Sequence, residues 1–387
     1  MTDSAPIPED FTALPPWNVP QSAPPDAASP HPVRQLLWGA GPVRLLLWGA
    51  GPAHLRFLKS LQKEPIPNAE ITLLTQHTQV LQPRKLAAYV ANDLKLAQCL
   101  TDVAPLLSGT GVQWTGRQGR AMDAASRTVL LDDRQVLDYD VLSINIGAQP
   151  YREAVEQAMP GAREHALFVP PLEGFINLWP KVCDLSRSRA LRIAVVGHCS
   201  AGFELALAVR KRMPTAAVTW IPAPQEPARD YSEALLQRML AILRAQRVTV
   251  LYDPVAALAR NDVVLASGAR LACDVPLLVL AQATPAWLQD TGLANSEQGA
   301  HVLGQRILTD AHQRSTSHPE VFFVQNDSTA LAGNLRAVVQ SEPANLRPPR
   351  PAPAQFLYAG ASHALVNWRG HLAQGRWVGW LKKLSRA

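Results

Sequence analysis

The 387-residue sequence lacks the long apolar runs and basic stripes that would identify several protein classes. No stretch reaches the roughly 18 uninterrupted apolar residues of a membrane-spanning helix. The start of the chain lacks a basic segment followed by an apolar one, so we expect no secretory signal. The net charge is +6, but the basic residues form neither a stripe nor a nucleic-acid-binding motif. We therefore expect a globular cytoplasmic protein with no nucleic-acid partner.

Cysteine is scarce, and its spacing argues against metal binding. The sequence holds four cysteines and no Cys-X-X-Cys or other metal-ligand spacing. We expect small buried thiols in a reducing compartment and no metal site. The four cysteines are Cys99, Cys183, Cys199 and Cys273.

Proline is concentrated in two segments that lack apolar periodicity. Residues 1–31 combine it with Ala, Ser and Asp, which predicts a disordered leader, and residues 341–355 predict a linker. Between these segments, short apolar runs alternate with runs of helical period. This alternation is typical of parallel sheets with helices on both faces. It restarts at residue 192, so we expect an α/β fold with two Rossmann-like dinucleotide-binding domains, each of three layers.

A ten-residue stretch occurs twice in succession. Residues 32–41 read PVRQLLWGAG, and residues 42–51 read PVRLLLWGAG. Only the second copy is followed by a run of helical period, and a dinucleotide-binding turn needs a helix N-terminus behind its glycines. We therefore expect the second copy to form the working turn. Residues 33–41 should lie outside the sheet core and bind nothing.

The second copy ends in a candidate dinucleotide-binding turn. In such turns the first glycine permits the tight bend, and the second lets a pyrophosphate approach the backbone at the positive helix N-terminus. A histidine stands at the third glycine position, and the next strand ends without the usual acid for a ribose hydroxyl. The alternative is an ordinary strand–helix turn with a histidine that is hydrogen-bonded in the core. The candidate residues are Gly49, Ala50, Gly51, Pro52 and His54.

A second turn between an apolar strand and a helix covers residues 197–202, GHCSAG. Cys199 replaces the central glycine, and its side chain would point into the space that a pyrophosphate needs. The strand that follows ends in Trp-Ile-Pro, residues 220–222, again without an acid. These features predict a nucleotide-binding fold with weakened chemistry; a purely structural turn is the alternative.

A third candidate covers residues 307–330, ILTDAHQRSTSHPEVFFVQNDSTA. Its apolar strand ends at Asn326-Asp327. At the carboxyl end of a strand, the Asp327 carboxylate is placed to accept a hydrogen bond from a ribityl or phosphate hydroxyl. The alternative is that Asp327 caps a helix N-terminus.

In this order and spacing, these stretches resemble the two-dinucleotide-domain flavoproteins of the pyridine nucleotide-disulfide oxidoreductase superfamily. The closer resemblance is to type II NADH dehydrogenase-like proteins, including those associated with selenide water dikinase. It covers roughly residues 43–387. The segments that carry it are GAGPAHL, YDVLSINIG, GFELALAVRKRM, HPEVFFVQNDSTA and NWRGHLAQGRWVGWLKK.

The resemblance implies an FAD-binding domain of residues 32–150 and 276–340, with an NAD(P)H-binding-like domain of residues 151–275 inserted in it. Residues 341–387 would form a linker and a C-terminal interface segment. The implied FAD contacts are the first turn with Gly49, Gly51 and His54, together with Gly147 and Asp327. The implied nicotinamide-side residues are Gly197, Cys199, Gly202 and Glu204.

The departures from the family's pattern fall mainly on the nicotinamide side. Cys199, the missing ribose acid and an Ala-Gln-Ala strand end at residues 281–283 replace the family's residues, so FAD is better supported than NAD(P)H. No Cys pair follows the first turn, which excludes dithiol chemistry. The flavin-side loop holds Arg84 and Lys85, which either stabilise reduced, anionic flavin or are surface cations at a helix start.

The resemblance implies an FAD-dependent oxidoreductase that passes a hydride from a nicotinamide to flavin, and electrons on to a quinone-like or small acceptor. The alternative is a binding or assembly partner with this fold, degenerate sites and little or no turnover. The tail places Trp377 and Trp380 among basic residues, which suits peripheral contact with an inner membrane; packing against its own domain is the alternative. The sequence also leaves a homodimer open.

Overall fold

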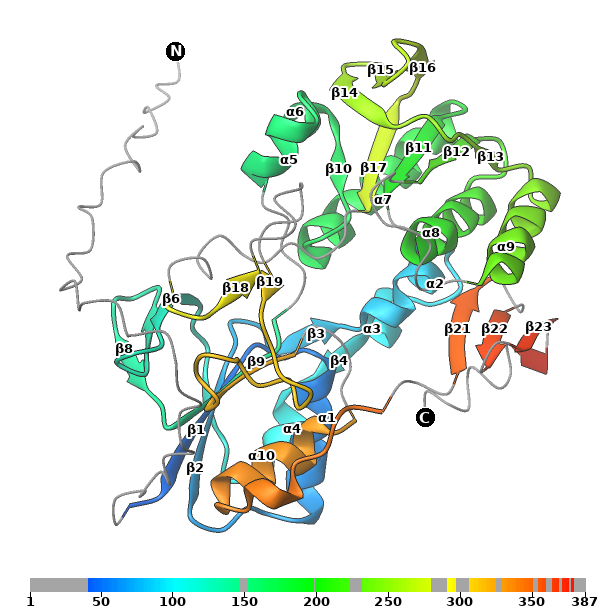
Figure 1. Cartoon of the computed structure of the whole chain (residues 1–387). Helices are drawn as coiled ribbons and strands as arrows, with labels where there is room; N and C mark the ends of the chain where they lie inside the picture. The colour runs from blue at the N-terminus through cyan, green and yellow to red at the C-terminus, as the bar shows by residue number, and fades with distance from the viewer. Residues whose placement is uncertain are drawn as a thin grey trace, which may run out of the picture. The chain divides into compact units, whose positions relative to one another are not determined.

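The computed structural model shows two parallel five-stranded sheets and a C-terminal antiparallel sheet (Figure 1). None of the helices in the described part of the chain has both the length and the apolar character needed to cross a membrane. The structure describes residues 41–146, 152–197, 199–222, 232–279, 291–296, 306–324, 329–350, 354–359, 364–368, 371–375 and 377–378.

The first sheet is built around β1 (Val43–Trp48), which pairs in parallel with β2 (Ala69–Leu74) and β9 (Val141–Ile144). β5 (Gln113–Thr115) extends the sheet beside β2, and β20 (Val321–Phe323) extends it beside β9. The strand order is β20-β9-β1-β2-β5. The central strand carries one polar residue in VRLLLW, as expected for a strand covered on both faces.

The second copy of the doubled stretch forms the first β–turn–α unit, as the sequence predicts. β1 ends at Trp48, a glycine turn follows, and α1 (Pro52–Lys63) begins. The helix buries Phe57, Leu58 and Leu61 at helical spacing and contacts α10 (Leu331–Val339). Of the first copy, residues 32–40 lie outside the described residues.

Short elements between β2 and β9 complete this part of the fold, and the apolar pattern predicts none of them. β3 and β4 pair antiparallel, and so do the three strands β6, β7 and β8. Their bounds, with those of the short helices, are β3 (Gln79–Leu81), η1 (Pro83–Lys85), α2 (Leu86–Val90), α3 (Leu96–Cys99), β4 (Leu100–Asp102), α4 (Ala104–Leu107), β6 (Gly119–Asp123), β7 (Thr128–Leu131) and β8 (Val136–Asp138).

The second sheet has the same plan around β11 (Arg192–Gly197). This strand pairs in parallel with β12 (Ala217–Ile221) and β17 (Val275–Val279). β13 (Thr249–Val250) lies beside β12, and β10 (Leu167–Phe168) lies beside β17. The order is β10-β17-β11-β12-β13.

Helices and a small antiparallel sheet accompany the second parallel sheet. α8 follows β11 directly and contacts both β11 and β12. β15 pairs antiparallel with β14 and β16. The bounds are α5 (Arg152–Ala158), α6 (Ala162–His165), α7 (Leu172–Ser188), α8 (Cys199–Arg212), α9 (Glu233–Ala245), β14 (Val255–Ala259), β15 (Asp262–Leu265) and β16 (Arg270–Ala272).

The topology confirms that the second dinucleotide-type domain is inserted in the first, because β20 returns to the first sheet after β17. The domain boundary expected between residues 275 and 276 is wrong in detail. β17 begins at Val275 and pairs along β11 from Ile193 to Gly197, so the second sheet continues to residue 279.

The C-terminal region contains a three-stranded antiparallel sheet, where the sequence predicts only a linker and an interface segment. β21 (Ala354–Tyr358), β22 (Ala364–Trp368) and β23 (His371–Gly375) pair in chain order. β21 begins one residue before the end of the proline-rich strip at 341–355. The two-residue strands β18 (Asn295–Ser296) and β19 (Arg306–Ile307) form a separate antiparallel pair.

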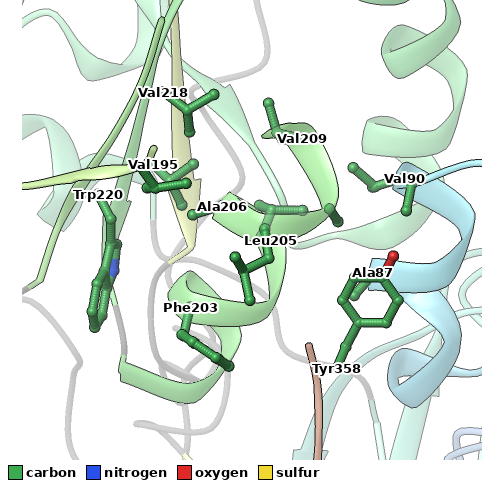
Figure 2. Close-up of a cluster of buried hydrophobic side chains, with 14 of the residues drawn as sticks. Ala87, Val90, Val195, Phe203, Leu205, Ala206, Val209, Val218, Trp220 and Tyr358 are labelled. Carbon is green, nitrogen blue, oxygen red and sulfur yellow. The ribbon is translucent and has the colours of Figure 1, made fainter. Parts of the chain in front are cut away.

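Helix α8 lies at the centre of the largest buried apolar cluster (Figure 2). Phe203, Leu205, Ala206 and Val209 from this helix belong to that cluster with side chains of the second sheet, of α2 and of β21. A helix that is apolar around most of its circumference is expected to be covered on several sides. Contacts with β11, β12, α2 and β21 provide this cover, so α8 connects the second parallel sheet with α2 and with the C-terminal sheet.

Polar contacts at the edge of this cluster connect the same three regions. The hydroxyl of Tyr358, the last residue of β21, donates to Asp93 Oδ2 over 2.6 Å. Asp93 also pairs with Lys211 of α8, and the backbone N–H of Tyr358 donates to the carboxylate of Glu204 on α8. Burial and the bond to Asp93 raise the pKa of Tyr358, so its hydroxyl keeps the proton that it donates. We call Asp93, Lys211, Glu204 and Tyr358 the α8 junction.

Substitution of Tyr358 tests the contribution of the α8 junction to stability. Tyr358→Phe removes the bond to Asp93 and should lower the free energy of unfolding by about 1–2 kcal/mol. Tyr139→Phe is the matched control, because that buried hydroxyl has no hydrogen-bond partner within the described residues. Its removal should leave stability unchanged or increase it. Denaturant unfolding checks both variants; equal losses would contradict the assignment.

Candidate functional site

The first glycine turn has a shape that only glycine allows at two positions. Gly49 has φ +92°, and a Cβ there would lie 2.5 Å from the carbonyl oxygen of Asn145. A Cβ on Gly51 would overlap with the amide oxygen of the Asn145 side chain. Asn145, the residue that follows β9, therefore leaves no room for a Cβ at either position. Ala50, between them, is buried, and Pro52 begins α1.

Asn145 connects three elements through its side chain, which is 2% exposed. Its Oδ1 accepts from the backbone N–H groups of Ala53 at 3.1 Å and His54 at 3.4 Å, at the start of α1. Its Nδ2 donates to the carbonyl of Val324, just after β20, over 2.7 Å. Asn145 is not among the site residues predicted from the sequence. The available signal was a polar residue at the end of an otherwise apolar strand, two positions after Ser143 and so on the same face.

His54 is fully buried, and both of its ring nitrogens contact protein atoms. Nδ1 lies 2.6 Å from the carbonyl oxygen of Gly49, and Nε2 lies 2.8 Å from Oγ of Ser143 on β9. Since a carbonyl only accepts, the neutral ring carries its proton on Nδ1 and accepts the Ser143 hydroxyl at Nε2. Burial lowers the pKa of His54 to about 4. These contacts agree with the alternative given above for His54, that of a histidine hydrogen-bonded in the core.

The other residues predicted on the flavin side are placed only in part. Arg84 and Lys85 end the short helix η1, where Arg84 is exposed and Lys85 Nζ donates to the carbonyl of Gln98 over 2.8 Å. Lys85 therefore contributes to the local fold, and the predicted role of the two cations beside a flavin stays a prediction. Gly147 and Asp327 lie outside the described residues.

The second glycine turn is also enforced by close contacts. Gly197 has φ +132°, and a Cβ there would overlap with the carbonyl oxygen of Val279 at the end of β17. A Cβ on Gly202 would overlap with the indole nitrogen of Trp220, which itself lies 3.4 Å from the carbonyl oxygen of Gly197. Trp220 is 1% exposed, so an indole fills the space beneath this turn. The side chain of Cys199 is outside the described part of the structure.

The structure places Glu204 in the α8 junction, where its carboxylate accepts the backbone N–H of Tyr358. The resemblance implies instead that this residue faces a nicotinamide. No local pattern predicts this contact, because Tyr358 lies 154 positions away, on a strand that is not apparent from the apolar pattern.

Buried His54 should make the protein less stable in acid. Its pKa is about 4 when folded and 6.5 ordinarily, so the unfolded chain takes up the proton first as pH falls. The free energy of unfolding should therefore fall from pH 6.5 to pH 4, by up to about 3 kcal/mol. His54→Gln should be less stable at pH 7 and show a smaller acid loss, whereas exposed His371→Gln should keep the wild-type profile. Denaturant unfolding at several pH values checks this, and an unchanged profile for His54→Gln would exclude the assignment.

A pair of glycine variants separates close contact from backbone conformation at the second turn. Gly197 and Gly268 both have positive φ, but nothing lies within 4 Å of a Cβ on Gly268. Gly268→Ala should cost about 1 kcal/mol of stability, from conformation alone. Gly197→Ala should cost at least about 3 kcal/mol, since its Cβ meets the backbone of β17. Thermal or denaturant unfolding compares the two, and similar losses would show that β17 moves away readily.

Known proteins support the relationship that the motifs imply. Residues 44–325 match the family described as pyridine nucleotide-disulphide oxidoreductase. A segment of 174 residues is 26% identical to the Alternative NAD(P)H-ubiquinone oxidoreductase C1, chloroplastic/mitochondrial, of Arabidopsis thaliana. That segment covers 40% of this chain and 33% of the plant protein, so the chain matches about a third of that relative's length.

Solved structures show the same fold at low sequence identity. The sulfide:quinone oxidoreductase of Aquifex aeolicus has a TM-score of 0.73 and 13% identity, covering 88% of this chain and 89% of its own. NDH2 of Plasmodium falciparum, solved in complex with NADH, has a TM-score of 0.68 and 11% identity, covering 89% and 94%. The family match spans both parallel sheets, from β1 to just beyond β20. The chain belongs to the pyridine nucleotide-disulphide oxidoreductase family.

Proposed function

We propose that the protein is a flavoprotein oxidoreductase that binds FAD at the first glycine turn and accepts a hydride from NAD(P)H. The first turn carries this proposal. It lies at the carboxyl end of the central strand of a parallel sheet, bends at a glycine of positive φ and leads into α1. This is the place at which doubly wound folds bind dinucleotides. Family membership supports the same function.

The backbone of the first turn fits a dinucleotide, with one exception. Gly49 and Gly51 carry no side chain at the turn, and the helix N-terminus behind them favours an anion. The neutral His54 adds no charge and stabilises the turn from inside. The exception is Asn145, which occupies the N–H groups of α1. When bound, FAD would supply the hydride chemistry, and this chain would bind and orient it.

The donor and the acceptor are proposed from the named relatives. The plant relative is an NAD(P)H-ubiquinone oxidoreductase, and the Plasmodium structure holds NADH. We therefore propose a nicotinamide donor at the second turn and a quinone-like or small acceptor. The roles of Gly147 and Asp327 in FAD binding stay predictions. Two exposed tryptophans of the C-terminal region, Trp368 and Trp377, are compatible with peripheral contact at a membrane surface.

A binding or assembly partner with little turnover is the second candidate function, and the second turn favours it. The indole of Trp220 fills the space beneath Gly202, and Glu204 is engaged with Tyr358. Neither contact needs a nicotinamide. A binding or assembly partner would keep the fold, and the second turn would then have a packing role only.

Visible absorbance of the purified protein distinguishes the two functions. An oxidoreductase should be yellow, or become yellow on reconstitution with FAD, and should bleach when NADH or NADPH is added without oxygen. Reoxidation by a soluble quinone would then identify the acceptor class. Protein that is colourless and gains no FAD would contradict the oxidoreductase proposal, and yellow protein that neither nicotinamide bleaches would contradict the proposed donor.

A further inference from the structure

We infer that Asn145 competes with the pyrophosphate of the dinucleotide for the N-terminus of α1, and so limits the affinity of the first turn for FAD. This inference rests on the proposed function. Asn145 would then determine how strongly the site holds its ligand, as a residue that occupies the anion-binding groups of the helix when no ligand does.

The hydrogen bonds of the turn carry the argument. From Gly51 to His54, every backbone N–H group donates to Asn145. Gly51 donates to its carbonyl oxygen over 2.9 Å, and Ala53 and His54 donate to its Oδ1 over 3.1 and 3.4 Å. Pro52 has no N–H to donate. The donors with which a helix N-terminus normally binds a phosphate are thus already used by one residue.

The space at the turn supports the same conclusion. The missing side chain of the second glycine in such turns normally leaves room for a pyrophosphate. At Gly51, the atoms nearest to the position of a Cβ are the side-chain amide atoms and the carbonyl oxygen of Asn145. The amide oxygen therefore lies where an anionic oxygen would approach the backbone.

Replacing the amide oxygen of Asn145 by a phosphate oxygen should reduce the affinity of the turn for FAD but not abolish binding. Bonds from N–H groups to a charged phosphate are about twice as strong as those to a neutral amide, so the ligand can take the donors. Displacing Asn145 removes its bond to the carbonyl of Val324 and leaves buried polar groups to find other partners. The net binding free energy of the ligand is the gain from the stronger N–H bonds to phosphate less the cost of displacing Asn145.

Substitutions of Asn145 test the competition. Asn145→Ala frees the N–H groups of Ala53 and His54 and should bind FAD about three- to tenfold more tightly. Asn145→Asp keeps an acceptor and adds a negative charge beside the pyrophosphate, so it should bind about tenfold more weakly. The dissociation constant is measured by quenching of FAD fluorescence during titration with flavin-free protein. Thermal unfolding of the flavin-free protein accompanies each titration.

Asn334→Ala is the matched control. Asn334 is also buried, and it joins α10 to the backbone of Arg347. Its Nδ2 donates to the carbonyl oxygen of Arg347 over 2.9 Å, and its Oδ1 accepts from the Arg347 N–H over 2.8 Å. Both alanine variants should unfold at a lower temperature than the wild type. Only Asn145→Ala should change the affinity for FAD. If Asn145→Ala does not fold, Asn145→Ser replaces it with the same expectation.

The outcomes separate this inference from the proposed function. Wild-type protein that binds FAD, with an Asn145→Ala variant that binds equally or more weakly, overturns the inference and leaves the function standing. FAD binding by Asn145→Ala but not by the wild type supports the inference and shows that the natural residue closes the site. Absence of FAD binding in every folded variant overturns both.

Discussion

The close approach of a neighbouring strand to the end of each central strand is the constraint on which both parallel sheets depend. In the first sheet the carbonyl oxygen of Asn145 lies against Gly49, and in the second the carbonyl oxygen of Val279 lies against Gly197. In each case the neighbouring strand arrives from far along the chain, and its parallel register brings its end level with the turn. The glycines are therefore required by sheet pairing before any ligand is considered.

The two turns use this shared geometry differently. A network of His54, Ser143 and Asn145 surrounds the first turn with fully hydrogen-bonded polar groups. Behind the second turn lies the indole of Trp220, within the large apolar cluster around α8. Buried polar networks of this kind specify one arrangement, because each group left without a partner is costly. The first turn is consequently held in place by buried polar groups, whereas the second is supported mainly by packing.

The sequence predicts those parts of the fold that depend on local patterns. β1, α1, β2, β11 and α8 are apparent from apolar period and glycine position, and the choice between the two copies of the doubled stretch is correct because only one precedes a helix. The extent of β17 and the C-terminal sheet were missed, since their strands are short and are stabilised by distant partners. The environment of His54 depends on Ser143, 89 positions away, so no local pattern reveals it.

Asp93 and Tyr358, whose side chains meet in the α8 junction, are 265 positions apart in the chain. In the part of the chain that the structure describes, the strands of both parallel sheets lie between residues 43 and 323, so each sheet can form without Tyr358. Closing so long a loop costs conformational entropy, which is recovered only when the rest of the loop is already ordered. We therefore expect a hierarchical order of folding, in which the sheets assemble first and the C-terminal strands join them last.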